Sequence, residues 1–456
     1  MKKIFQYIML AVVTIVMASC TSDIEETTTT TGTSNVQLVV GEFPAFGDSQ
    51  TRAIGTPDEG KTSWAEGDEL LLEMTSKTFG TKYATFKYNG SSWELASGEL
   101  SYKEDEGPTF PHVYYAPNYK WEAGKLVLKE GKAAGTDEYI EGTAQITPNG
   151  EAITVKFAEA TRNYSRLRIA TMPNKPITVT IDRYTPAGSS DMKWDQKYAL
   201  TSDEKGNAYL YGNFENNSEV TVKYEEAPLA TYKFSQESKN AKSYALDATV
   251  ISANSAEEIK SAIQKEVADG KTAIRLNIAS DAGDNEFKAI REAFENVRGN
   301  VQDGTIELTL IGCKEIPADG LNNQSRGLEA LKSITLPDVT KIGKNALLHC
   351  VDLEEICAPN VSAIDEGAFA GCYYLRKVTF GKLTDVRGEA NSRSGIFDDI
   401  NDLNLDIDLY LPKNQEVMEF DENQYIWKPT GESYFAGSDK DNVFLGYQFM
   451  SVKKWE

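Results

Sequence analysis

The sequence predicts a mainly β protein in which two tandem β-sandwiches are followed by an α/β repeat region that forms a solenoid. Three observations lead to this prediction: short alternating strands between 36 and 250, helical spacing from Ser255, and a 22-residue period after residue 330. With 456 residues, the chain is also too long for one ordinary core. We therefore expect two or three domains.

The N-terminus has the features of an export signal. Lys2 and Lys3 precede an apolar run at 4–16, which is too short to span a bilayer comfortably. The following Met17-Ala18-Ser19-Cys20 resembles a bacterial lipobox, in which the cysteine is diacylated and the chain is cut before it. The resemblance implies a signal peptide at 1–19 and lipid attachment at Cys20. An ordinary signal peptide with a chance cysteine is the less favoured alternative, because Cys20 directly follows the apolar run.

Residues 20–35 are polar and rich in threonine, so we expect them to form a flexible tether behind the lipidated cysteine. The acids Asp23, Glu25 and Glu26 resemble the surface-export signal of lipoproteins in some Gram-negative bacteria. That resemblance implies an outer-membrane lipoprotein displayed on the cell surface. No later stretch is apolar enough to span a membrane, so we expect the lipid to be the only anchor. The net charge of -22 disfavours binding to nucleic acid.

Residues 36–250 have the pattern of many short strands. Apolar residues recur at every second position at Val36, Leu38 and Val40. Similar alternation recurs throughout this region between turn signals such as Asn149-Gly150. Strands at this spacing predict β-sandwiches. We expect two of them, with a boundary near 150–165.

This half of the chain resembles the fimbrillin-like family of surface and pilus proteins. The resemblance is carried by Thr51-Arg52-Ala53, by Trp64-Ala65-Glu66-Gly67-Asp68 and by Tyr114-Tyr115-Ala116-Pro117. It implies proteolytic maturation between Arg52 and Ala53, which would remove a strand at 36–40 and open a groove for a strand of another pilus subunit. The chain continues beyond the sandwiches and so lacks a free donor tail, which would suit a pilus tip or accessory subunit. The favoured alternative is a standalone lipoprotein in which Arg52 is an ordinary surface residue.

A change of pattern marks the start of the second half. Ser255-Ala256-Glu257-Glu258 is a capping box, and apolar residues follow it at helical spacing. A second helical stripe lies at 287–297, and alternating strands are expected at 274–278 and 306–310. We expect the apolar face of both helices to pack into the core.

The strongest regularity is a repeat of 22 residues. Leucine, isoleucine, valine, alanine and cysteine recur in phase at Leu331, Leu353 and Leu375, at Ile342, Ile364 and Val386, at Ala346 and Ala368, and at Cys350 and Cys372. Units of this length stack on one another because none can bury its own apolar face. A degraded third copy is expected at 396–412.

These copies resemble the BspA-type leucine-rich repeat. The matching segments are Leu331 to Ala346 and Ile364 to Leu375, and the resemblance extends over about 255–450. We assign residues 251–456 to this domain. Members of the family are surface adhesion and host-interaction proteins, so the resemblance implies binding of an extracellular protein or glycan. Among the exposed repeat residues Lys332, Thr335, Glu354 and Lys377, none stands out as a ligand contact.

The sequence favours a binding protein over an enzyme. It has only two histidines, His112 and His349, and no Gly-x-Ser-x-Gly elbow, phosphate-binding loop or dinucleotide fingerprint. We expect no cofactor and no metal site, since the acidic stretches lack the spacing of a calcium loop. A glycan-binding or glycan-degrading protein is the alternative, because paired carboxylates are set by distance in space.

The four later cysteines all lie in the repeat half. We expect Cys350 and Cys372, which occupy equivalent positions, to be small buried apolar residues of the solenoid core. Disulfides involving them, Cys313 or Cys357 are the less favoured possibility for an exported chain.

Overall fold

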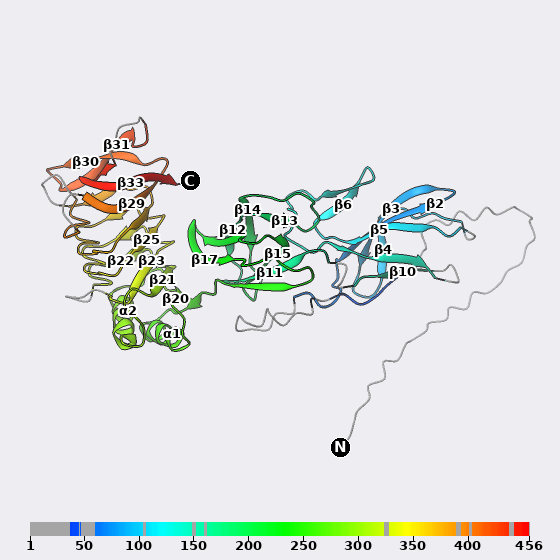
Figure 1. Cartoon of the computed structure of the whole chain (residues 1–456), viewed down its shortest axis with the longest axis horizontal. Coiled ribbons are helices and arrows are strands. Elements are labelled where there is room, and N and C mark those ends of the chain that lie inside the picture. The colour runs from blue at the N-terminus through cyan, green and yellow to red at the C-terminus, as the bar shows by residue number, and fades with distance from the viewer. Residues whose placement is uncertain are drawn as a thin grey trace, which may run out of the picture.

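The computed structural model is elongated, with two β domains and the repeat domain arranged in a row (Figure 1). It describes residues 37–44, 46, 60–103, 106–147, 152–158, 162–322, 328–388, 394–400, 404–436 and 442–455. Cys20 with the expected signal peptide and tether, and Arg52 with Ala53, lie outside these residues. The prediction of a mainly β chain with an α/β repeat region is confirmed.

The first domain is built on one eight-stranded sheet that curls around a single apolar core. In spatial order its strands are β8 (Ile140–Glu141), β5 (Thr109–Tyr115), β2 (Glu69–Ser76), β3 (Gly80–Tyr88), β4 (Trp93–Gly98), β1 (Gln37–Val40), β10 (Ala152–Lys156) and β9 (Thr143–Ile146). Strand β1 lies inside this order, antiparallel to β4 and parallel to β10. The first segment of the described chain is therefore an interior strand of the sheet.

The second domain is a sandwich of two four-stranded sheets. One contains β13 (Tyr184–Pro186), β15 (Asn207–Phe214), β11 (Ser165–Ala170) and β18 (Ser243–Asp247); the other contains β14 (Gln196–Thr201), β12 (Pro176–Ile181), β16 (Glu219–Tyr224) and β17 (Ala227–Lys233). Phe214 and Phe234 stack in its core with ring centroids 4.5 Å apart. A small hairpin, β6 (Tyr119–Glu122) and β7 (Lys125–Leu128), lies beside β3 of the first domain, where Trp121 contacts Tyr83.

The two β domains meet at a buried cluster of arginines and aromatic rings. The Arg162 side chain is fully buried and forms two hydrogen bonds with the Glu138 carboxylate, at 3.0 and 3.1 Å. Its guanidinium also lies 4.1 Å from the ring centroid of Phe46, which follows β1 in the chain. Arg166 stands at 4.7 Å from the same ring centroid. These contacts fix the segment after β1 to the second domain.

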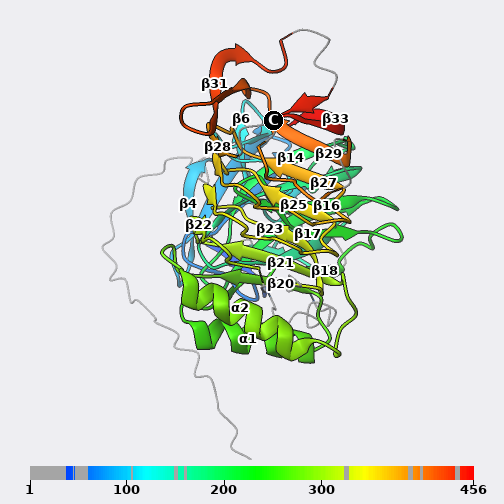
Figure 2. The ribbon, with the colours of Figure 1, turned by 90° about the vertical axis from the view of Figure 1, so that its left-hand side faces the viewer.

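The repeat domain begins with two helices, α1 (Ala256–Ala268) and α2 (Asp284–Val297), which cover its first coils (Figure 2). The capping box at Ser255 and Glu258 is confirmed, since each side chain accepts a hydrogen bond from the main-chain N–H of the other residue. Ile259 and Ile263 of α1 pack with Phe287 and Ile290 of α2 against the solenoid core, as the helical stripes predict.

The coils of the repeat domain form two sheets, whose strands are stacked one above another in Figure 2. The nine-stranded sheet contains β19 (Ile251–Ser252), β20 (Ala273–Asn277), β21 (Ile306–Ile311), β23 (Leu331–Thr335), β25 (Glu355–Ala358), β27 (Lys377–Phe380), β29 (Asn404–Pro412), β33 (Tyr447–Trp455) and β32 (Val443–Phe444). The six-stranded sheet contains β22 (Glu315–Ile316), β24 (Lys341–Ile342), β26 (Ala363–Ile364), β28 (Asp385–Arg387), β31 (Ile426–Ser433) and β30 (Glu416–Asp421). The strands pair in parallel except at the C-terminal end, where β31, β30 and β32 pair antiparallel with their neighbours.

The strand register follows the repeat period where the copies are regular. Ile334 pairs with Ile356, which pairs with Val378, and Ile342 pairs with Ile364, which pairs with Val386. All six side chains are fully buried between the two sheets. Residue-to-residue stacking at this spacing is what a solenoid requires, because each coil completes the core of its neighbours.

Candidate ligand-binding face of the repeat domain

The nine-stranded sheet turns one face toward the solenoid core and the other away from it. Side chains alternate between the two faces along each strand, so the residues between the buried positions point outward. In strand order, one outward row is Ala273, Glu307, Ser333, Glu355, Lys377, Asp408 and Ser451, and the next is Arg275, Thr309, Thr335, Cys357, Thr379, Tyr410 and Lys453. The two rows cross seven strands in register and are largely polar.

The later strands of this face carry a ladder of alternating charges. Lys377 on β27 lies 2.7 Å from the carboxylate of Glu355 on β25, and Lys453 on β33 lies 3.0 Å from the carboxylate of Asp408 on β29. Tyr410 lies between the two lysines, whose amines stand 5.8 and 5.4 Å from its ring centroid. Cation–π contacts on both sides hold the ring in place and present an ordered aromatic surface between charges.

The neighbours of Lys377 and Asp408 shift the pKa values of both side chains in the direction that favours their charged forms. Burial acts to lower the pKa of Lys377, but the hydrogen bond and charge of Glu355 outweigh it and raise that pKa above its usual value. Hydrogen bonds from Ser451 and Lys453 lower the pKa of Asp408 below its usual value. The ladder therefore stays charged at neutral pH, as a surface that recognises polar or charged groups requires.

The second β domain covers the first strands of this face (Figure 1). Ile311 at the end of β21 joins the core of that domain, and the Arg275 guanidinium Nε donates a hydrogen bond to the Leu229 carbonyl at 2.6 Å. Between the two domains remains a cavity of about 480 Å³, lined by residues of β17, β18, β20, β21, β23 and β25. The outward rows are thus partly enclosed at one end and open at the other.

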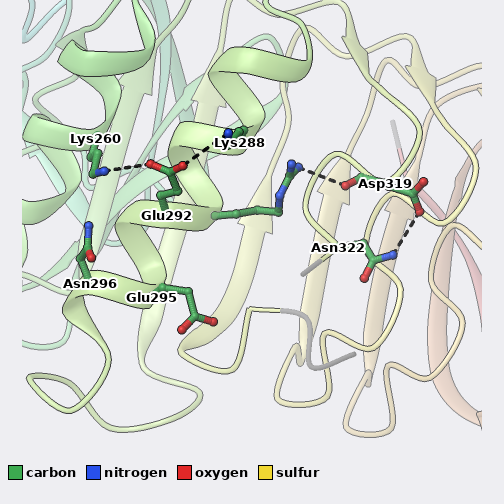
Figure 3. Close-up of a pocket in the computed structure, with 8 residues that line it drawn as sticks. Lys260, Lys288, Glu292, Glu295, Asn296, Asp319 and Asn322 are labelled. Atoms are coloured by element: carbon green, nitrogen blue, oxygen red, sulfur yellow. Dashed lines mark hydrogen bonds and ion pairs between the residues drawn. The ribbon is translucent and has the colours of Figure 1, made fainter. Parts of the chain in front are cut away.

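A second hollow lies on the helices at the start of the domain, and Figure 3 shows its side chains. Its volume is about 660 Å³, and it has charged residues of both signs on α1, α2 and the following coil. Glu292 lies 2.8 Å from Lys260 and 3.9 Å from Lys288, while Arg291 donates hydrogen bonds to the carbonyls of Asp319 and Gly320. The two lysines are paired with Glu292 and Arg291 is bonded to main-chain carbonyls, which makes this hollow a less promising site than the sheet face.

The four cysteines of the repeat domain are buried and free, as predicted for Cys350 and Cys372, and the less favoured disulfides are not formed among them. Burial raises the pKa of Cys313, Cys350 and Cys357 to about 12 and raises that of Cys372 well above its usual value, so none is a thiolate at neutral pH. In the parts of the chain that the structure describes, no group of three or more His, Cys, Asp or Glu residues could hold a metal ion. Those parts also contain no helix that is both long and apolar enough to cross a membrane.

Only part of this face is visible in the sequence. Of the exposed repeat residues named from the sequence, Thr335 and Lys377 lie in the outward rows, whereas Lys332 and Glu354 do not. The sequence pattern did not place Arg275, Asp408, Tyr410, Ser451 and Lys453 on this face. A repeat of 22 residues leads from Lys377 to Asp399, whereas the strand partner of Lys377 is Asp408. Because the connection before β29 is longer than one repeat, the 22-residue period does not predict which residues continue the rows on β29 and β33.

Comparison with known proteins identifies the family of the repeat. Residues 323–401 match the BspA type leucine rich repeat region (6 copies). No curated protein matches the chain. A crystal structure described as that of a "putative cell adhesion protein" from Bacteroides fragilis is 11% identical, with a TM-score of 0.26 and coverage of 47% of this chain and 92% of that one. A likeness at this TM-score is too weak to establish a shared arrangement of domains.

Proposed function

We propose that this chain is a lipid-anchored surface protein that binds an extracellular protein or glycan through the outward face of its nine-stranded sheet. The observation that carries the proposal is the pair of in-register, largely polar rows across seven strands, with Tyr410 held between Lys377 and Lys453 near the open end of the rows. An extended face with an ordered aromatic ring and fixed charges suits recognition of a large polar partner. The match of residues 323–401 to a leucine-rich repeat family supports the same function.

Binding is favoured over glycan cleavage on this face. A glycosidase needs one carboxyl group whose pKa is raised, so that it can act as a general acid. The pKa of Asp408 is lowered instead, by Ser451 and Lys453, and Glu355 is in an ion pair with Lys377. Both carboxylates are suited to hold the lysines and Tyr410 in place.

The anchor and the location are part of the proposal. The lipobox at Met17-Ala18-Ser19-Cys20 supports acylation at Cys20, and the acids behind it support display on the outer membrane surface. The threonine-rich tether would then carry the elongated molecule away from the membrane. In that arrangement, the repeat domain lies at the far end of the row of domains from the N-terminal strand (Figure 1).

Assembly into a pilus is a second candidate, favoured by the place of β1. Cleavage between Arg52 and Ala53 would release β1 from between β4 and β10 and expose the main-chain edges of both. Its loss would also remove Phe46 from Arg162 and Arg166. The N-terminal residue of the mature protein separates the candidates: a lipidated Cys20 indicates a standalone lipoprotein, and Ala53 indicates a pilus subunit.

The test of the binding face uses the secreted chain with Cys20→Ala, applied to arrays of extracellular proteins and glycans. We expect Tyr410→Ala to lose at least about tenfold in affinity for whatever the unchanged face binds, as central aromatic anchors do. Tyr374→Ala is the matched control, because Tyr374 is 57% exposed but does not belong to the outward rows. Equal losses in both variants, or none in Tyr410→Ala, would contradict the assignment of the face.

A further inference from the structure

Strand β17 has an unpaired edge that faces the repeat domain. It is the last strand of its sheet and pairs only with β16, over Glu219–Tyr224. On its other side, the residues Pro228 to Tyr232 line the cavity of about 480 Å³ between the domains. An edge of this kind presents a row of main-chain donors and acceptors to the cavity.

Two contacts show which main-chain groups of β17 point into the cavity. The Phe234 N–H donates to the Ser218 carbonyl at 2.9 Å, so Phe234 directs its N–H toward the β16 side. Directions alternate along a strand, so the N–H and C=O of Thr231 point away from β16. The hydroxyls of Thr231 and Thr221 lie 3.2 Å apart, as expected for a pair of opposed residues that exchange no main-chain hydrogen bonds. Thr231 is exposed, and on this side β17 has no strand partner in the described part of the chain.

The opposite wall of the cavity is the polar start of the sheet face. Ser333 and Thr335 offer hydroxyls, and Glu307 on β21 offers a carboxylate. Glu307 and Asp247, which also lines the cavity, form no ion pair with any described residue. The one cation of the lining, Arg275, is largely buried and its Nε is bonded to the Leu229 carbonyl. The charge of Arg275 offsets part of the charge of Asp247 and Glu307, so the lining keeps a net negative charge. The cavity therefore combines a strand edge that is open at Thr231 with a net negative lining.

We propose that this cavity binds an extended polypeptide segment with basic side chains, which adds to β17 as a further strand. Main-chain hydrogen bonds to Thr231 would give it direction and register, and lysine or arginine side chains would reach Glu307 and Asp247. Its volume lies within the range of about 300–1,000 Å³ that is usual for ligand sites. The site shares Glu307, Ser333 and Thr335 with the covered start of the outward rows but does not include Tyr410 or the lysines beside it, so a peptide in this cavity goes beyond the binding proposed for the open end of the face.

The experiment measures fluorescence anisotropy of the labelled peptides acetyl-(Thr-Lys)₄-amide and acetyl-(Thr-Glu)₄-amide with the full Cys20→Ala chain. Thr231→Pro removes the outward N–H without breaking the pairing with β16, whereas the control Thr231→Ala keeps that N–H. We expect the lysine peptide to bind and the glutamate peptide not to bind. Thr231→Pro should weaken the lysine peptide by about tenfold through the lost hydrogen bond and the clash of the ring, and Thr231→Ala by less than about threefold.

A second pair of variants keeps the proposal testable if Thr231→Pro fails to fold. Glu307→Lys reverses the charge inside the cavity, and Glu219→Lys makes the same change on the exposed end of β16, outside it. We expect only Glu307→Lys to weaken the lysine peptide by at least about tenfold, because it places like charges opposite each other in the complex. Equal effects of the paired variants would mean general attraction to an acidic protein and would overturn the proposal. The absence of any binding at millimolar peptide would also overturn it. If the free chain dimerises and Thr231→Pro abolishes the dimer, the edge belongs to a second copy of the chain and the proposal is likewise overturned.

Discussion

The buried ion pair between the two β domains gives a prediction whose size follows from the structure. The side chains of Arg162 and Glu138 are 0% and 5% exposed, and the carboxylate accepts two hydrogen bonds from Arg162 and one at 2.5 Å from the Tyr164 hydroxyl. Glu138→Gln keeps the shape but removes the charge that compensates Arg162. Loss of one partner of a fully buried pair costs about 3–5 kcal/mol. Glutamine retains one acceptor oxygen, so we expect a loss near the lower end of that range, about 3 kcal/mol.

Hydrogen exchange of peptides that cover residues 137–170 measures this loss locally, which suits a chain of several domains. The matched control is Glu141→Gln, because Glu141 is 54% exposed and lies 3.3 Å from His112 at the surface. An exposed pair contributes at most about 1 kcal/mol, so the control should change little. The double variant Glu138→Leu with Arg162→Met, which removes both charges, should recover most of the loss. If Glu138→Gln costs no more than Glu141→Gln, the compensating role of Glu138 is refuted.

Three further predictions concern other parts of the molecule. Burial raises the pKa values of Cys313, Cys350, Cys357 and Cys372. Iodoacetamide at pH 8 should therefore leave these four cysteines unmodified in the folded chain and label them in urea. Rapid labelling without urea would contradict this prediction. Gly98→Ala should destabilise the first domain by more than about 1 kcal/mol in thermal unfolding, since φ is +82° and a Cβ would lie 2.0 Å from the Tyr83 carbonyl oxygen; an unchanged melting temperature would refute it. The pKa of Asp408 is lowered in the folded chain, so its stabilising contribution is present above its unfolded pKa of about 3.9 and is lost as the pH falls through the folded pKa. In Asp408→Asn, the free energy of unfolding should therefore fall less steeply as the pH is lowered through this range. An unchanged decrease with pH would argue against this contribution.

The regular coils could be predicted from the sequence because their contacts are periodic. The spacing of Ile334, Ile356 and Val378 gave the register of three neighbouring strands directly. The capping box at Ser255 and the stripes of both helices are likewise local patterns, and all three are confirmed.

The candidate site could be predicted only in part, because its remaining contacts join distant segments. Strand β33 pairs with β29 across a long connection, so no period relates Lys453 to Tyr410. The parallel pairing of β1 with β10 and the contact of Arg275 with Leu229 are also set by how whole domains meet. A sequence pattern describes which face of a strand is apolar, but it does not describe which domain covers that face.

The most direct test of the account is protease treatment of intact cells, followed by mass spectrometry of the released and the retained peptides. A repeat domain displayed for binding should release peptides from 255–456 under external protease, while a lipidated peptide that begins at Cys20 stays with the membrane. Protection of the whole chain in intact cells, with digestion only after the outer membrane is opened, would place the sheet face in the periplasm. That result would contradict the function proposed for the face around Tyr410.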